Sequence, residues 1–219
     1  MSWPKPWFNL HCKLCPRLAQ GLADVRREFP HYHAAPVPPF GDRNARLLIV
    51  GLAPGMHGAN RTGRPFTGDH AGIILYETLH RHGFANQATG DDPDDGLKLI
   101  HCRISNAVKC LPPANKPTGS EVRTCNAYLA AELSALPKDA VIIALGRVAH
   151  EAVLAGVGER RADFAFGHGY EHALARGGYL LDSYHCSRYN TQTRRLTPAM
   201  FDRVFARAAQ LIARAGAVA

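Results

Sequence analysis

Residues 46–55 read Arg46-Leu-Leu-Ile-Val-Gly-Leu-Ala-Pro-Gly55, an apolar run that breaks into a glycine-rich loop. A short apolar run that stops at a glycine and proline turn predicts a buried strand, here over residues 46–50. Residues 103–108, 140–145 and 178–183 are three further candidate strands.

Helical patterns lie between these strands. Asp69 can cap a helix that runs to about Arg81, with Gly83 beyond its end. The segment Thr118-Gly-Ser-Glu121 is a capping box that predicts a helix reaching Ala135. Because strands that alternate with helices imply a parallel sheet covered on both faces, the fold class is α/β.

Two more helices complete the pattern. Gly146 opens a helix to about residue 155, and Thr197-Pro198 begins the last helix. The apolar stripe of the last helix includes Phe201, Val204, Phe205, Ala208, Leu211 and Ile212. We therefore predict a three-layer α/β/α fold with a central four-stranded parallel sheet, and leave the strand order open.

Candidate ligand-binding groups follow the ends of three of these strands. The loop over residues 51–55 follows the first strand, Asn106 lies near the end of the second, and His185 follows the fourth. Because ligands of parallel sheets bind outside the carboxyl ends of the strands, we expect these groups to share one site.

The length of 219 residues and the hydrophobic content of 46% allow a full core, most simply as one domain over residues 1–219. Residues 1–45 form an N-terminal segment, and the proline-rich stretch 34–40 separates the first cysteines from the core. Residues 90–96 are an acidic, turn-rich surface loop.

The net charge of +8 favours a polyanionic partner such as nucleic acid. The sequence has no apolar run of membrane-spanning length, and residues 3–10 lack the pattern of a signal peptide. We therefore expect a cytoplasmic protein without a membrane partner. In that compartment its six cysteines are more often metal ligands or free thiols than disulfides.

Four of the cysteines have the spacing of a metal site, Cys12-x2-Cys15 and Cys110-x14-Cys125. Four thiolates at such spacings bind zinc or an iron-sulfur cluster if the chain between them folds back. The other two, Cys102 and Cys186, are expected to be small buried hydrophobic residues.

Two motifs narrow these alternatives: residues 51–69, Gly51-Leu-Ala-Pro-Gly-Met-His-Gly-Ala-Asn-Arg-Thr-Gly-Arg-Pro-Phe-Thr-Gly-Asp69, and residues 184–187, Tyr184-His-Cys-Ser187. Both resemble the type B, or family 5, uracil-DNA glycosylases. The resemblance implies a monomeric enzyme of base-excision repair that flips uracil, and other deaminated bases, out of double-stranded DNA and hydrolyses the N-glycosidic bond. It also implies a structural 4Fe-4S cluster on the four cysteines, and a prokaryotic protein associated with the nucleoid.

The resemblance assigns roles to the pocket residues. His185 would bond the uracil O2 and Asp69 would orient the attacking water or stabilise the cationic sugar. The loop residues Gly51, Ala53 and Gly55 would contact the base, and Phe66 would stack on it. Asn106 has a physical argument as well, because a carboxamide offers one acceptor and two donors that match the N3-H and O4 of uracil.

The resemblance also assigns DNA contacts. The segment over residues 187–197 resembles a family loop that enters the minor groove, and Arg194 stands in it where glycine is expected. Tyr189 or Gln192 would fill the vacated stack. The full set of candidate DNA contacts is Arg61, Arg64, Ser187, Arg188, Tyr189, Gln192, Arg194 and Arg195. The acidic loop 90–96 would repel DNA, so we place it away from this face.

Each assignment has a plainer alternative. Asp69 can be only a helix cap, and Phe66 only a core residue. Asn106 and His185 can each satisfy buried polar groups, and the arginines of the late segment can form a solvated surface. At the level of function, the alternatives are a non-catalytic lesion-sensing DNA-binding module with a structural metal cluster, and a zinc protein of unrelated function.

The motif around Leu52 predicts the substrate range. Residues 52–55 offer no aromatic or acidic barrier beside the base, so we expect a roomy pocket. Hypoxanthine presents at N1-H and O6 the same donor and acceptor pair as uracil. We therefore expect release of hypoxanthine as well, unless Met56 or His57 folds over the site.

Overall fold

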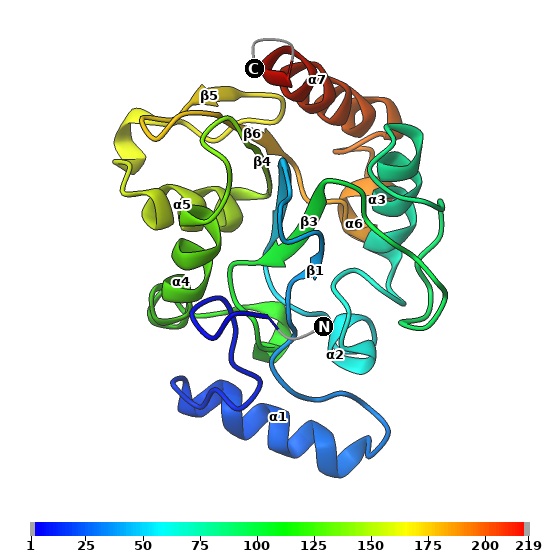
Figure 1. Ribbon diagram of the computed structural model, residues 1–219. Coiled ribbons are helices and arrows are strands. Elements are labelled where there is room, and N and C mark those ends of the chain that lie inside the picture. Colours follow the sequence, from blue (N-terminus) through cyan, green and yellow to red (C-terminus); the bar gives the residue numbers. More distant parts are fainter. Residues whose placement is uncertain (1–2, 217–219) are drawn as a thin grey trace.

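Four parallel strands form the centre of the fold, in the computed structural model that describes residues 3–216 (Figure 1). Their order across the sheet is β3 (Cys102–Asn106), β2 (Leu47–Gly51), β4 (Val141–Leu145) and β6 (Tyr179–Ser183). Every residue of β2, β3 and β4 is buried. The unbroken apolar runs of β2 and β4 predict this burial, whereas β3 also buries Arg103, Ser105 and Asn106. The predicted α/β class and its four-stranded parallel centre are confirmed.

Two short antiparallel strands widen this sheet at its edges, which the sequence did not predict. β1 (Phe40–Gly41) pairs with β3, and β5 (Glu171–Ala173) pairs with β6. At two and three residues, both strands are too short to give a periodic sequence signal. The observed sheet therefore has six strands rather than the predicted four.

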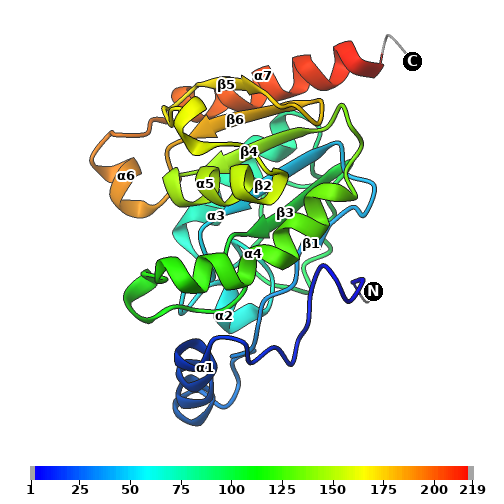
Figure 2. The ribbon, with the colours of Figure 1, turned by 90° about the vertical axis from the view of Figure 1, so that its left-hand side faces the viewer.

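Helices cover both faces of the sheet (Figures 1 and 2). On one face α3 (His70–Arg81) and α7 (Pro198–Gly216) pack against Leu47 and Ile49 of β2. On the other face α4 (Gly119–Ser134) and α5 (Arg147–Val157) pack against the alternate residues, Leu48 and Val50. Because successive side chains of a strand point to opposite faces of the sheet, β2 contributes to both hydrophobic cores.

The four predicted helices are confirmed, with small changes at their ends. Asp69 caps α3, and the predicted capping box with Thr118 and Glu121 is present at the start of α4. α5 runs to Val157, two residues beyond its predicted end. The strand predicted over residues 103–108 lies over Cys102–Asn106, and the next two amides donate to the carbonyls of Gly51 and Leu52 at the end of β2.

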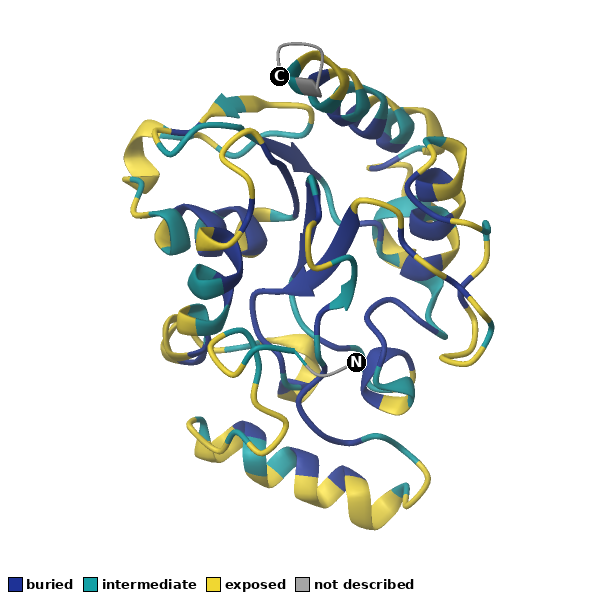
Figure 3. Cartoon of the chain, in the orientation of Figure 1, coloured by how far each residue is buried: buried dark blue, intermediate teal, exposed yellow. Residues whose placement is uncertain are grey.

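Three helices were not predicted: α1 (Pro16–Glu28), α2 (Ala59–Thr62) and α6 (Arg188–Gln192). Two 3-10 turns, η1 (Pro113–Asn115) and η2 (Arg161–Asp163), complete the elements. α1 lies below the sheet layers in Figure 1, and much of its surface is exposed in Figure 3. None of the helices between residues 3 and 216 has the length and apolar character needed to cross a membrane.

Candidate functional site

A cavity of about 440 Å³ opens at the carboxyl ends of the central strands. Most of the predicted base-binding and catalytic residues line it. Its lining consists of Leu52, Ala53, Gly55, Ala59, Phe66, Asp69, His70, Ala71, Asn106, Asn115, His185, Ser187 and Arg188. Asp69 is the only carboxylate among these residues, as the motif indicated.

The floor of the cavity is formed where β2 and β3 end together. Gly51 and Asn106 are paired across the two strands. A side chain at position 51 would place its Cβ 2.5 Å from Asn106 Oδ1 and 2.9 Å from the Phe66 ring, so only glycine allows these groups to approach. The Asn106 side chain has no hydrogen bond to residues 3–216 and lines the cavity, so its donors and acceptor are available to a ligand.

Asp69 both caps α3 and faces the cavity. Its Oδ1 accepts hydrogen bonds from the amides of Ala71, at 3.0 Å, and Gly72, at 3.2 Å. Its Oδ2 has no such partner within the described chain and packs beside Gly58 and Gly55. Burial raises the pKa of the Asp69 carboxyl, and the two amides partly oppose that rise. One oxygen of Asp69 therefore caps the helix, and the other remains available for a role in the reaction.

His185 and Phe66 form one wall of the cavity. Their rings are stacked, with centroids 6.0 Å apart and planes 25° apart. Burial lowers the pKa of His185 to about 4, so its imidazole is neutral at physiological pH and can donate one N–H. Phe66 has a left-handed backbone with φ of 58°, and Gly72 leaves room for its carbonyl oxygen. This strained turn aims the ring into the site.

Two polar lining residues, Asn115 and His70, were not predicted from the sequence. Asn115 follows Ala114 in the η1 turn, and both residues have left-handed backbones. The sequence Pro112-Pro113-Ala114-Asn115 could have indicated this turn, since asparagine tolerates the left-handed conformation. His70 Nε2 lies 3.0 Å from Thr191 Oγ1 and connects the start of α3 to α6.

The residues 187–195, which we call the outer segment, lie at the rim of the cavity. They begin as the helix α6, capped by Ser187, rather than as the predicted loop. Tyr189 is 70% exposed, and Gln192 and Arg194 are exposed. The Arg195 guanidinium lies 4.7 Å from the ring centre of Tyr184. Arg194 has φ of 57°, the left-handed conformation that explains why glycine was expected there.

The prediction that Arg64 contacts DNA is wrong. Its side chain is buried and donates to both carboxylate oxygens of Asp95, at 2.8 Å and 2.7 Å, and to Thr67. The guanidinium in turn holds the pKa of Asp95 down to about 2. The acidic loop 90–96 therefore supplies a structural ion pair. Arg61, in contrast, is exposed and donates to the His57 carbonyl.

Cys12, Cys15, Cys110 and Cys125 line a second, smaller cavity between α1 and α4. The Lys109 amide donates to Cys125 Sγ at 3.3 Å. No three of the four sulfurs lie within 4.8 Å of one another in the described chain, whereas those of a tetrahedral zinc site would be about 3.8 Å apart. Cys102 and Cys186 are fully buried elsewhere, as predicted.

Burial makes negative charge unfavourable in this second cavity. It raises the pKa of Cys110 to about 12, and charge on the neighbouring thiols contributes to that rise. Arg17 of α1 donates to both carboxylate oxygens of Glu121 on α4, which fixes the two helices around the sulfurs. Four thiolates can share this cavity only if bound metal compensates their charge.

The comparisons with known proteins agree with this site. The sequence profile described as "Uracil DNA glycosylase superfamily" matches residues 38–209. This chain belongs to the uracil-DNA glycosylase superfamily. It is 48% identical over 205 residues to "Type-5 uracil-DNA glycosylase" of Thermus thermophilus, covering 91% of this chain and 93% of that protein.

Two further relatives carry the same name. The protein of Mycobacterium leprae is 45% identical over 209 residues, covering 91% of this chain and 91% of the relative. That of Pyrobaculum aerophilum is 42% identical over 216 residues, covering 94% of each chain.

Proposed function

We propose that this protein is a monofunctional DNA glycosylase that flips uracil out of duplex DNA and hydrolyses its N-glycosidic bond, leaving an abasic site for base-excision repair. The observation that carries the proposal is one cavity that combines a free carboxamide, a carboxylate with an unused oxygen and a neutral imidazole. Because one chain contains all these groups, we propose that it acts as a monomer. We also propose that it acts at the nucleoid of a prokaryotic cell.

The proposed roles follow from how charge moves when the bond breaks. The sugar becomes oxocarbenium-like while negative charge collects on the departing base. A neutral His185 keeps one N–H, which can donate to the uracil O2 as negative charge collects there. The free oxygen of Asp69 can orient water or stabilise the sugar, because its other oxygen is held by the α3 amides. Phe66 would stack on the flipped ring.

We further propose that the pocket accepts hypoxanthine. Asn106 can meet the same donor and acceptor pair on either base, and the side chains that could narrow the site lie elsewhere. Met56 packs against the cluster of α1 residues, and His57 Nδ1 lies 2.9 Å from the Tyr32 hydroxyl. Neither lines the cavity.

The four cysteines around the second cavity are proposed to hold a structural 4Fe-4S cluster. Their wide spacing favours a cluster over a single zinc ion. The bound cluster would supply charge compensation and link α1 to α4, while the reaction uses none of its atoms. Purified protein should contain iron and sulfide in a ratio near one to one, and serine at any of the four positions should lose the iron. Iron-free protein with zinc bound through sulfur would refute this assignment.

Base release from duplexes tests the function. Matched duplexes with uracil, hypoxanthine or xanthine at one position would be incubated with excess enzyme, and alkali-labile sites would be counted. Uracil and hypoxanthine should be released, fastest from mismatches, where extrusion is easiest. Uracil release alone would refute the roomy pocket, and a DNA shift without cleavage would support the non-catalytic module.

A further inference from the structure

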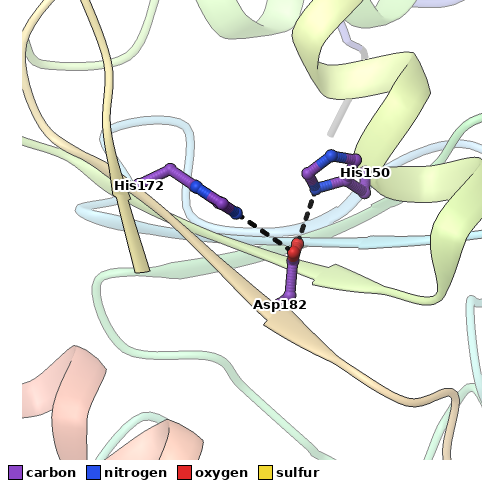
Figure 4. A group of neighbouring side chains, drawn as sticks. All are labelled: His150, His172 and Asp182. Carbon is purple, nitrogen blue, oxygen red and sulfur yellow. Dashed lines mark hydrogen bonds and ion pairs between the residues drawn. The ribbon is translucent and has the colours of Figure 1, made fainter. Parts of the chain in front are cut away.

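A second group of potential metal ligands lies away from the catalytic cavity. His150 of α5, His172 of β5 and Asp182 of β6 point toward one another (Figure 4). His150 Nδ1 is 2.7 Å from Asp182 Oδ1, and His172 Nε2 is 3.2 Å from Asp182 Oδ2. In residues 3–216 this is the only group of three or more His, Cys, Asp or Glu whose ligand atoms all lie within 4.8 Å.

The hydrogen-bond partners of His150 favour a cation, a proton or a metal ion, between His150 and Asp182. Its Nε2 lies 3.1 Å from the carbonyl oxygen of Phe164, which can only accept. A neutral imidazole has only one N–H. If His150 donates it from Nε2 to the Phe164 carbonyl, the lone pair of Nδ1 faces the Asp182 carboxylate, and two acceptors are in contact. A second ring proton or a metal ion would resolve this conflict. Metal-bound histidines commonly donate their other N–H to a backbone carbonyl in this way.

The burial of these three side chains also favours a bound cation. The Asp182 side chain is fully buried, and those of His150 and His172 are 2% and 13% exposed. Besides the imidazoles, the carboxylate receives only the Gly167 amide, at 3.3 Å, within the described residues 3–216. Buried carboxylates in proteins are usually paired with a cation or coordinate a metal ion.

We propose that His150, His172 and Asp182 bind a divalent transition-metal ion of the Zn²⁺ type. Two imidazoles and a carboxylate are a common ligand set for this ion, with water in the fourth position. Ligand atoms of a tetrahedral zinc site are about 3.4 Å apart, so small side-chain rotations would open the 2.7 Å pair enough. The slight exposure of His172 gives the ion a route of entry.

The ion would brace the strand that leads to the catalytic histidine. It would join α5, β5 and β6 three residues before His185, at a point where the rings of Phe164 and Tyr170 make edge-to-face contacts with His172. Its role is structural, because the group does not line the catalytic cavity.

Metal analysis of the full-length protein tests this proposal. Protein purified with Zn²⁺ supplied should hold one zinc ion per chain in addition to its iron, and zinc X-ray absorption should show nitrogen and oxygen ligands without sulfur. His172→Gln should lose the zinc and keep the iron. His168→Gln is the control, because His168 lies beside Leu181, Met200 and Arg203 on the α7 side of β6 and accepts from the Tyr184 amide, and this variant should keep the zinc.

Three results would overturn the proposal. One is wild-type protein without stoichiometric zinc, which would leave a second proton on His150 as the cation. Another is zinc bound through sulfur, which would place it at the cysteines. The third is zinc retained by both His172→Gln and Asp182→Asn. Since the wild-type measurement needs no variant, the test does not depend on how well the variants fold.

Discussion

The cavity and the outer segment differ in how tightly their side chains are held. In the cavity, strand pairing places Asn106 beside Gly51, and backbone amides fix one oxygen of Asp69. In the outer segment, Tyr189 and Arg194 project into solvent. Preorganised groups suit chemistry, and exposed cations suit phosphate contacts. We therefore expect substitutions in the cavity to change rate, and those in the outer segment to change affinity.

The largest effect is expected from Asp69→Asn. Asparagine caps helices about as well as aspartate, so this change removes the carboxylate and keeps the cap. The single-turnover rate of uracil release should fall about 100-fold or more, while DNA affinity stays within a few-fold. A near-wild-type rate would show that Asp69 is only a cap.

A matched pair of glycine substitutions tests the cavity floor. Gly51→Ala would place a Cβ 2.5 Å from Asn106 Oδ1, whereas Gly55→Ala would place one 3.6 Å from Asp69 Oδ2, an ordinary contact. The first should lower the excision rate about 10-fold or more, since small misplacements near reacting groups are costly, and the second should change it little. Equal effects of the two changes would contradict the proposed packing.

The pH dependence of the rate tests the charge states in the cavity. The lowered pKa of His185, about 4, keeps its imidazole neutral, so the single-turnover rate should show no break near the ordinary histidine value of about 6.5. The rate should fall on the acid side as Asp69 is protonated, at a pH above the ordinary aspartate value of about 3.9 because its pKa is raised. A break near 6.5 that disappears in His185→Ala would contradict a neutral donor.

The smallest effect concerns the backbone of the outer segment. Arg194→Gly and Arg194→Ala remove the same charge, but only glycine relieves the left-handed conformation. The glycine variant should have a free energy of unfolding about 1 kcal/mol higher than the alanine variant. Chemical denaturation measures this difference, and equal stabilities would mean that position 194 carries no strain.

The sequence predicted what depends on local patterns. β2 and β4 appear in the sequence as unbroken apolar runs, and the Asp69 and Thr118 caps mark helix starts, so these elements were found. It also indicated which side chains line the cavity, because the carboxyl ends of neighbouring strands meet. α1 was missed although Leu18, Leu22 and Val25 lie on one face at helical spacing.

Partners distant in the sequence were not predictable in this way. Nothing near Arg64 indicates that Asp95 will bury it, and its position in the motif suggested DNA contact instead. His150, His172 and Asp182 lie on three elements, and only the sheet order brings them together. Such ion pairs depend on tertiary packing rather than on spacing along the chain.

The most direct test measures uracil release and DNA affinity together on one duplex with a G·U pair. It compares the wild type with a variant in which Arg194 and Arg195, neither of which lines the cavity, are both glutamine. Both should release free uracil at the same rate at saturating enzyme. The variant should bind more weakly, and the slope of its affinity against salt should fall by about 0.9 for each phosphate that an arginine no longer neutralises. If the wild type binds this duplex at enzyme excess and releases no uracil, the proposed function is wrong.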